Sequence, residues 1–356
     1  MNKALCIHFG TCGGCSYQDM PDDAYRALKR DLVVRALAGE NLADAVVEEI
    51  VTVPPRSRRR AALKAEKRKG ETHIGFNAAR SHDIVDMREC FVLTPELFAF
   101  VQGARAMMNA ILHDGEKAEL HLTQADNGID MLMRWPRKTN PAVVSEIAKH
   151  AAALNLVRVT ANGEPLLERG APVLKLGKAE VRIPPDAFLQ PTLEGEGALQ
   201  SRVADLLTKS KAIADLFCGA GTFTFPLAER ARVLAVDGDK PMVEALANAA
   251  RNTQGLKPVT VEKRDLFKQP MLAEELKSFD AAVLDPPRAG AQALARELAK
   301  SKVVRIAYVS CNAESFARDA RILVDGGYRM GPVTPVDQFL WSAHVELIAG
   351  FTRPRR

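Results

Sequence analysis

From residue 188 onward, apolar and polar positions follow a regular order of short buried strands and amphipathic helices. Short apolar runs predict strands at 212–217, 233–237, 259–263, 281–285 and 303–309. Helical spacing predicts helices at 222–229, 242–252, 271–277, 292–300 and 313–324. Strands that alternate with helices form a parallel, doubly wound α/β sheet, and ligands bind at the carboxyl ends of its strands. Two final strands, 328–336 and 345–351, are joined by a turn and predict an antiparallel pair at the sheet edge.

The first half of the chain has a less regular pattern. Residues 1–25 are rich in cysteine and glycine and lack apolar periodicity. Residues 26–187 mix short strands with helices, which predicts a smaller α+β region, and Lys69-Gly70 predicts a hairpin turn within it. The sequence therefore predicts three parts: a cysteine-rich segment (1–25), a central α+β domain (26–187) and the regular α/β domain (188–356).

Composition sets outer limits on the class of protein. The 356 residues, 47% hydrophobic and 26% charged, are typical of a soluble globular chain with two domains or more. No run of about 18 apolar residues appears, and no apolar segment of a signal peptide follows Met1. We therefore expect a cytoplasmic protein with no membrane segment. In that compartment, six cysteines favour metal binding or catalysis over disulfides.

Basic residues are concentrated in one stretch, although the net charge of the chain is only +5. The stretch contains Arg56, Arg58, Arg59, Arg60 and Lys64, and it continues to residue 69 with a single acidic residue. Such a cluster neutralises phosphates and releases their counterions. A solvated strand face gives the same pattern. These five residues are candidate nucleic-acid contacts.

A glycine turn follows the strand 212–217. Gly219 and Gly221 allow the backbone to turn tightly and to approach a ligand closely. Asp237 ends the next strand, where an acidic residue can bind ribose hydroxyls. Both features suit a dinucleotide and S-adenosylmethionine alike, but Thr224 replaces the third glycine that a pyrophosphate would need. Asp265, after the third strand, is placed to meet an adenine amino group or to cap a helix.

Three reactive groups lie at other strand ends. Asp285 ends the fourth strand and precedes two prolines, which fix a rigid turn and remove N–H donors. Cys311 follows the fifth strand at the start of a predicted helix, where the pKa of a thiol falls. Glu346 lies in an apolar strand, where burial raises the pKa of a carboxyl, as a general base requires. An ordinary turn and a buried structural cysteine are the alternatives for the first two.

The region 188–351 resembles the RNA uracil-5-methyltransferase family. The matching pieces, in the family's order, are Phe188-Leu189-Gln190, Asp215–Gly221, Asp237, Asp285–Arg288, Ser310-Cys311-Asn312 and Asp337…His344-Val345-Glu346. The resemblance implies a Rossmann-like class I methyltransferase domain that uses S-adenosylmethionine to methylate C5 of a uridine in RNA. The chain departs from the family pattern at Thr192, Asp237, Gln338 and Leu340, where Asn, Glu, Met and Pro are usual.

The resemblance also implies roles for individual residues. Cys311 is the nucleophile that adds to C6 of the uracil, and Glu346 removes the proton from C5. The uracil leaves its stack to reach them, and Phe188 or Phe339 can stack on it. Contacts to the cofactor or the target base are expected from Gln190, Phe217, Gly219, Gly221, Thr222, Asp237, Asp265 and Asp285.

Four cysteines form a second set of candidate ligands. Cys6, Cys12 and Cys15 have the spacing C-x5-C-x2-C, and Cys90 follows far along the chain. Four thiolates hold zinc or an iron–sulfur cluster, and spacing alone does not choose between them. One branch of the resembled family carries a [4Fe–4S] cluster at these places and mostly modifies 23S ribosomal RNA. The resemblance therefore implies a cluster and favours 23S rRNA as the substrate, with tRNA as the alternative.

Other classes of function leave features of the chain without a role. An iron–sulfur oxidoreductase would have a complete dinucleotide fingerprint and no task for Cys311 and Glu346. A non-catalytic RNA-binding protein would have lost one of these two residues. The family often has a small barrel-like RNA-binding domain before the cysteines, which here begin at Cys6. We expect that domain to be missing, RNA to contact the central domain, and the protein to act as a monomer without a protein partner.

Overall fold

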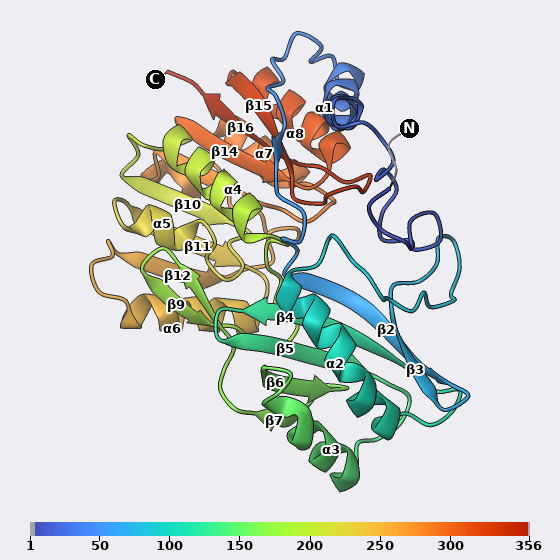
Figure 1. Ribbon diagram of the computed structural model, residues 1–356. Helices are drawn as coiled ribbons and strands as arrows, with labels where there is room; N and C mark the ends of the chain where they lie inside the picture. The colour runs from blue at the N-terminus through green and yellow to red at the C-terminus, as the bar shows by residue number, and fades with distance from the viewer. Residues whose placement is uncertain (1–3, 355–356) are drawn as a thin grey trace.

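The computed structural model describes residues 4–354, so the first three residues of the predicted cysteine-rich segment lie outside the described part. Figure 1 shows two sheets that lie one above the other, each with its own helices. The larger sheet is formed mainly by the C-terminal half of the chain, and the smaller by residues 60–168. Within the described residues, no helix is long and apolar enough to span a bilayer.

The larger sheet confirms the predicted α/β architecture. Its order is β1-β15-β16-β14-β13-β10-β11-β12. The parallel strands of the centre are β10 (Ala212–Leu216), β11 (Arg232–Asp237), β12 (Val259–Lys263), β13 (Ala281–Leu284) and β14 (Arg305–Ser310). The antiparallel pair is β15 (Arg329–Asp337) and β16 (Glu346–Thr352), and β1 (Val51–Thr52) lies outside it. The strand pair is therefore close to the edge, as predicted.

Helices cover both faces of the larger sheet because its strands are apolar on both sides. The covering helices are α4 (Leu193–Leu206), α5 (Thr224–Ala228), α6 (Lys240–Asn252), α7 (Gln292–Lys300) and α8 (Ala313–Asp325). Along β10, Ala214 and Leu216 join a core with α7 and α8, while Ile213 packs on the opposite side with α4 and α5. The alternation of strand side chains therefore builds two separate cores.

One predicted helix is wrong. The stretch 271–277 contains only a short 3-10 turn, η1 (Glu275–Ser278), in a long loop between β12 and β13. The side chain of Arg264 holds this loop in place, because it donates hydrogen bonds to the carbonyl oxygens of Gln269 and Pro270 and pairs with Glu275. These bonds give the backbone an alternative to a helix.

The smaller sheet has helices on one face only. Its order is β3-β2-β4-β5-β6-β7. The strands are β2 (Arg60–Arg68), β3 (Glu71–Gly75), β4 (Lys117–Ala125), β5 (Gly128–Arg134), β6 (Leu156–Ala161) and β7 (Glu164–Glu168). Helices α2 (Pro95–Ile111) and α3 (Pro141–Ala151) pack on the side where Leu63, Leu120 and Met131 form the core. The predicted hairpin turn is confirmed, since Lys69 and Gly70 have φ values of 50° and 83° between β2 and β3.

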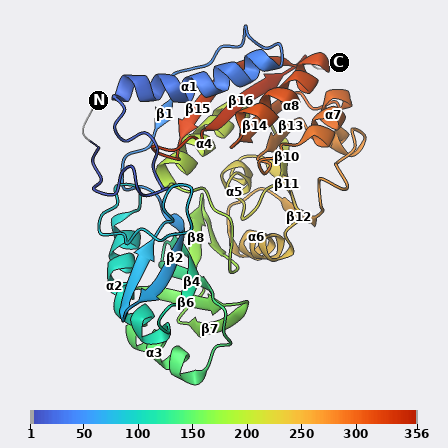
Figure 2. The same ribbon diagram turned by 90° about the vertical axis from the view of Figure 1, so that its right-hand side faces the viewer.

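The position of the N-terminal helix differs from the predicted division of the chain, which put residues 26–187 in the central domain. Helix α1 (Asp22–Gly39) packs beside α8 and β15 of the larger sheet, as Figure 2 shows. Its Val33 and Leu37 are buried in the same core as α7 and α8. The small sheet of β8 (Val173–Leu176) and β9 (Ala179–Arg182) likewise packs against α6. The segments that precede and follow the smaller sheet in the sequence therefore pack with the larger sheet.

Candidate active site

The fold brings the predicted nucleophile and base to one edge of the larger sheet. Cys311 directly follows β14, and Glu346 is the first residue of β16. These strands pair antiparallel with Ser310 opposite Leu347, so Cys311 and Glu346 are the next opposed positions in the register. Two residues that are 35 positions apart in the sequence thus lie at the same edge of the sheet.

Two glutamine side chains connect the carboxylates of this edge. Nε2 of Gln190 donates a hydrogen bond to Oδ2 of Asp285, over 3.0 Å. Nε2 of Gln338 donates to Oε1 of Gln190 over 2.6 Å and to Oε2 of Glu346 over 3.0 Å. Gln338 is a residue that sequence reasoning missed as part of the site, because its only signal was that it stands where the family usually has Met.

Burial determines the protonation of the two carboxyl groups. Glu346 is 2% exposed, and this burial raises its pKa well above the usual value, with nearby Asp285 adding to the shift. Burial, together with the charge of Asp215, raises the pKa of Asp285 to about 7. Because a proton on either group relieves repulsion between them, the pair can accept one proton near neutral pH.

The Cys311 thiol differs from the expectation of a lowered pKa. Burial, together with Glu346 and Asp285, raises its pKa to about 11, and Arg288 offsets only part of this. The N-terminus of α8 does not act on the thiol as expected, because the side chain of Asn312 accepts hydrogen bonds from the first free N–H groups of the helix. Activation of the thiol therefore requires added positive charge.

The glycine turn adopts the conformation that its sequence predicts. Gly219 and Gly221 have φ values of 52° and 98°, and Phe217 shares the left-handed region at 64°. A Cβ atom on Gly221 would lie 2.6 Å from the ring of Phe225, so a larger residue does not fit there. The backbone N–H of Gly219 donates to Oδ2 of Asp237 over 2.9 Å. Asp237 therefore holds the turn as well as facing the ligand crevice.

The remaining predicted cofactor residues lie around this turn. The ring of Phe217 lies 5.3 Å from that of Phe267, which is 52% exposed. Asp265 accepts hydrogen bonds from the backbone N–H groups of Phe267 and Lys268, so it holds a turn, and the helix that it was expected to cap as the alternative is absent there. Thr222 is half-buried beyond the glycines.

Asp215 is a second residue that sequence reasoning missed as a site residue. It is fully buried at the end of β10, and its Oδ2 accepts a hydrogen bond of 2.5 Å from the hydroxyl of Thr224. Its Oδ1 has no partner, and burial raises the pKa of the group to about 7. A buried acceptor without a donor, next to a ligand turn, fits a cationic ligand group. The bond to Thr224 also explains why the third glycine of the fingerprint is replaced.

The four N-terminal cysteines line one cavity. Cys6, Cys12, Cys15 and Cys90 surround a volume of about 60 Å³. Gly14 N–H donates to Sγ of Cys12, and Nε2 of Gln18 donates to Sγ of Cys15, both over 3.4 Å. Between residues 4 and 354, no three His, Cys, Asp or Glu side chains are placed to hold a single metal ion. Four sulfurs with N–H donors are the donor set of an iron–sulfur cluster, so the residues fit that group. Nε2 of His8 accepts a hydrogen bond from the backbone N–H of Arg88, so this nitrogen is not free to bind a metal.

The predicted basic stretch is divided by the fold. Arg59 is 3% exposed and pairs with Glu196 over 2.7 Å, so the prediction that it contacts a nucleic acid is wrong. Arg58 is half-buried and donates to the carbonyl oxygen of Arg60. Arg56 is exposed, and its guanidinium lies 5.0 Å from the centre of the Phe91 ring.

Arg60 and two phenylalanines line a cavity next to residues 189–191. The guanidinium of Arg60 lies 5.1 Å from the centre of the Phe188 ring. Phe188 is 64% exposed, and with Phe339 it lines a cavity of about 230 Å³ that Arg58 also reaches. Phe188 lies two residues before Gln190 in the sequence, and an exposed phenylalanine can stack on a base that has left a helix.

Comparison with known proteins identifies the family. The family model described as tRNA (uracil-5-)-methyltransferase matches residues 175–352. The chain belongs to this family. It is 32% identical to the 23S rRNA (uracil(1939)-C(5))-methyltransferase RlmD of Aeromonas hydrophila, across 98% of this chain and 82% of that protein. It is 41% identical to an uncharacterized RNA methyltransferase of Brucella suis, across 99% of this chain and 84% of that protein. The chain is therefore an RNA methyltransferase, as predicted, and the oxidoreductase and non-catalytic alternatives are set aside.

A solved structure shares the fold of this methyltransferase. It is the Pyrococcus abyssi tRNA (uracil-54, C5)-methyltransferase, determined in complex with S-adenosyl-L-homocysteine. The TM-score is 0.75 at 22% identity, and the match covers 95% of this chain and 86% of the other. The likeness extends across both sheets, so the smaller sheet belongs to the shared architecture.

Proposed function

We propose that this enzyme transfers a methyl group from S-adenosylmethionine to C5 of a uridine in RNA. The observation that carries the proposal is the placement of Cys311 opposite Glu346 in the β14–β16 register, with Asp285 at the same edge. Methylation at C5 needs a nucleophile for C6 and a base for the C5 proton within one pocket. The family assignment supports the same reaction.

The glycine turn and its neighbours fit the methyl donor. The unpartnered Oδ1 of Asp215 suits the ammonium group of S-adenosylmethionine, and Asp237 suits its ribose. Phe217 and Phe267 offer ring faces to the adenine. Gly219, Gly221, Thr222, Asp265, Gln190 and Asp285 complete the proposed set of contacts. When bound, the sulfonium supplies an electrophilic methyl group and the positive charge that the Cys311 thiol lacks.

The proposed reaction begins at Cys311. The thiolate forms a bond to C6 of the uracil, and the electron pair moves to the C4 carbonyl to give an enolate. The electron pair of the enolate would then form the bond from C5 to the methyl group, while the bond from the methyl group to the sulfonium sulfur breaks and a neutral thioether leaves. Glu346 removes the C5 proton, the bond between C6 and sulfur breaks, and the double bond of the ring and the thiolate are restored. A carboxylate with a raised pKa is a competent base for a carbon acid at neutral pH.

Gln338 orients the base. Its Nε2 holds one oxygen of Glu346, while its contact with Gln190 fixes the amide itself. A carboxylate held by an amide donor has fewer orientations, so its free oxygen points at one place. The same amide pair reaches Asp285, which links the proposed donor site to the proposed base.

The proposed substrate is 23S rRNA. The proposal rests on the 32% identical relative that is named for that RNA and on the four-cysteine set. The family description and the Pyrococcus abyssi structure favour tRNA as the second candidate. Mass-spectrometric mapping of 5-methyluridine in both RNAs, from cells with and without this gene, tests the choice. We expect one 23S rRNA site to lose its methyl group, and a loss confined to tRNA would contradict this.

The proposed group at the four cysteines is a [4Fe–4S] cluster. Cys6, Cys12, Cys15 and Cys90 would hold it, and the N–H donors from Gly14 and Gln18 would stabilise the thiolates. Its proposed role is structural, because the ligands tie the N-terminal segment to the loop that carries Cys90. Zinc is the alternative, and iron analysis separates the two.

A further inference from the structure

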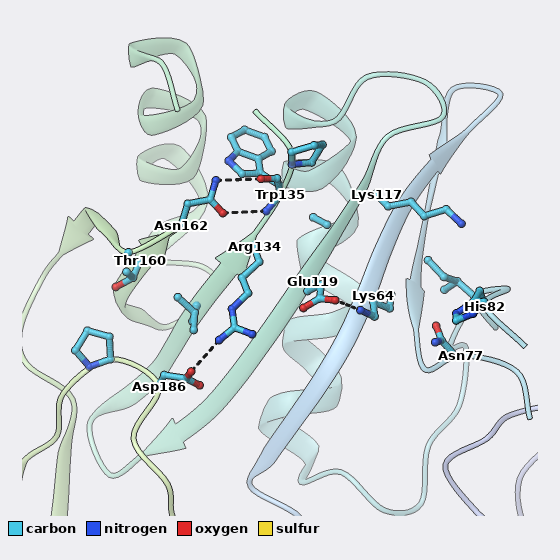
Figure 3. A pocket seen from close by; sticks show the side chains of 16 residues that line it. Lys64, Asn77, His82, Lys117, Glu119, Arg134, Trp135, Thr160, Asn162 and Asp186 are labelled. Atoms are coloured by element: carbon cyan, nitrogen blue, oxygen red, sulfur yellow. Dashed lines mark hydrogen bonds and ion pairs between the residues drawn. The ribbon is translucent and has the colours of Figure 1, made fainter. Parts of the chain in front are cut away.

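The face of the smaller sheet that has no helices contains a wide, open cavity. It has a volume of about 820 Å³, and we call it the sheet basin. Figure 3 shows it from close by, with side chains from β2, β4, β5 and β6 directed into it. The six that matter here are Lys64, Lys117, Arg134, Trp135, Thr160 and Asn162. This volume is within the range of about 300–1,000 Å³ that is typical of ligand pockets.

Two polar atoms in the lining have no hydrogen-bond partner. They are Nε1 of Trp135 and Oγ1 of Thr160, whose side chains are 6% and 3% exposed. A buried donor or hydroxyl without a partner is unfavourable, so such atoms are rare unless a ligand satisfies them. Asn162 fixes the position of Trp135 through hydrogen bonds to its backbone N–H and carbonyl, as Figure 3 shows. The two atoms therefore belong to a built site and not to a loose surface.

Two basic side chains of the basin can exchange their carboxylate partners for a bound anion. Arg134 pairs with Asp186 over 2.9 Å, and Lys117 with Glu66 over 3.6 Å, with both cations at least half exposed. Exposed ion pairs of this kind contribute little to stability. A phosphate can therefore replace the carboxylates at small cost and gain two charge-assisted bonds.

The sheet basin lies next to the cavity that Phe188 and Phe339 line. The cavity lined by Phe188 and Phe339 shares Leu132 and Asp186 with the basin. Arg60 lies in this second cavity, next to Phe188. The two adjacent cavities thus form one track of cations and aromatic rings along the uncovered face of the sheet. The track reaches Phe339, which follows Gln338, the hydrogen-bond partner of Glu346.

We propose that the sheet basin binds a nucleotide of the substrate RNA that flanks the target uridine. Its base contacts Trp135 Nε1 and Thr160 Oγ1, and its phosphate contacts Lys117 and Arg134. This inference rests on the proposed function, since the continuity of the track has meaning only if RNA reaches Cys311. The occupant is single-stranded, because a base must be free of its partner to enter a pocket.

The first test removes charge. The double variant Lys117→Ala with Arg134→Ala is compared with Lys302→Ala with Arg329→Ala, two exposed cations at the opposite end of the larger sheet. Filter binding of an unmodified 23S rRNA transcript is measured from low to high salt. In the basin variant we expect binding about tenfold weaker, with a salt slope lower by roughly 0.7, as one single-strand phosphate contact requires. The control should match wild type.

The second test removes one hydroxyl. Thr160→Val deletes a buried polar atom without a partner, so the melting temperature should rise by about 2 °C. If the hydroxyl serves only the fold, RNA binding stays unchanged. If the basin holds a nucleotide, binding of the transcript weakens severalfold in a more stable protein. Unchanged binding in both this variant and the charge variant would overturn the proposal.

A separate readout distinguishes failure of the basin from failure of the proposed function. Methyl transfer from labelled S-adenosylmethionine is measured with the transcript and with a five-nucleotide RNA that contains the target uridine. In the basin variants, KM for the transcript should rise while kcat stays unchanged. With the short RNA, both constants should match those of wild type. If wild type places no methyl group at C5, the proposed function fails. If wild type does and the basin variants bind like the control, only the basin proposal fails.

Discussion

At the scale of single residues, neighbours determine what each carboxylate can do. Asp237 accepts hydrogen bonds from the backbone N–H groups of Gly219 and Asp239, so its carboxyl group holds the glycine turn. Glu346 has one amide donor, is almost fully buried, and lies near the charge of Asp285, so it holds a proton more tightly. The sequence predicted Glu346 from its apolar strand, but it could not predict Gln338, because a glutamine carries no sign of its partner 148 positions away.

The base can be separated from the nucleophile by trapping the intermediate. Glu346→Gln should still allow Cys311 to add and the methyl group to transfer, but the C5 proton cannot leave. The variant should therefore hold methylated RNA as a covalent adduct on denaturing gels. Cys311→Ala should lower methyl transfer by a factor on the order of 10⁶ while cofactor binding persists, and the double variant should form no adduct. Normal turnover by Glu346→Gln would show that another group is the base.

The role of Gln338 can be seen in a pH profile. The hydrogen bond from Gln338 lowers the pKa of Glu346, so Gln338→Leu should raise that pKa further. Because the base acts in its ionised form, the rising limb of kcat should move to higher pH, with KM for RNA little changed. At neutral pH, kcat should fall about tenfold, as expected for a shift of one pH unit. A uniform loss at every pH would indicate a packing defect instead.

At the scale of elements, α1 fixes the segment that leads into β16. Lys29 of α1 is fully buried, and its Nζ contacts Oδ1 of Asp337 over 2.7 Å and the carbonyl oxygens of Phe339 and His344. Tyr25 donates from its hydroxyl to Oδ2 of Asp337 over 2.5 Å. The N-terminal helix therefore orders the turn between β15 and β16, and with it the position of Glu346.

Loss of this buried pair should be costly. Lys29→Met leaves Asp337 buried without its cation, so the free energy of unfolding should fall by about 3–5 kcal/mol. Lys149→Met on α3 removes an exposed cation from a pair with Glu146 and should change it by less than about 0.5 kcal/mol. Urea unfolding measures both variants. A small effect of Lys29→Met would show that the turn is held by other contacts.

Elements that repeat a local pattern were predictable, and elements set by distant partners were not. Helix α7 has the predicted bounds, 292–300, because its apolar spacing is local. The predicted helix at 271–277 failed because the bonds of Arg264 decide the backbone there. Strand β1 has two residues and exists only through pairing with β15, nearly 300 positions away, so no window of sequence could reveal it.

At the scale of the whole molecule, the cysteine cavity and the cavity on the uncovered face of the smaller sheet have a residue in common. Arg58 lines the cavity of the four cysteines and also the cavity with Phe188 and Phe339. The N-terminal segment thus lies next to the proposed RNA track, although no sequence pattern connects Cys6 with Phe339. A well-ordered N-terminal segment around the four cysteines should therefore support RNA binding as well as folding.

The group at the cysteines can be identified by metal content. Protein purified without oxygen should be brown and contain about four irons per chain, since four thiolates hold a [4Fe–4S] cluster. Cys90→Ser removes one proposed ligand and should lose the colour, most of the iron and some thermal stability. Cys218→Ser is the matched control, because Cys218 is buried in the glycine turn, away from the cavity. This variant should contain as much iron as wild type. One zinc per chain without iron would replace the cluster by a zinc site, and iron retained by Cys90→Ser would remove that cysteine from the ligand set.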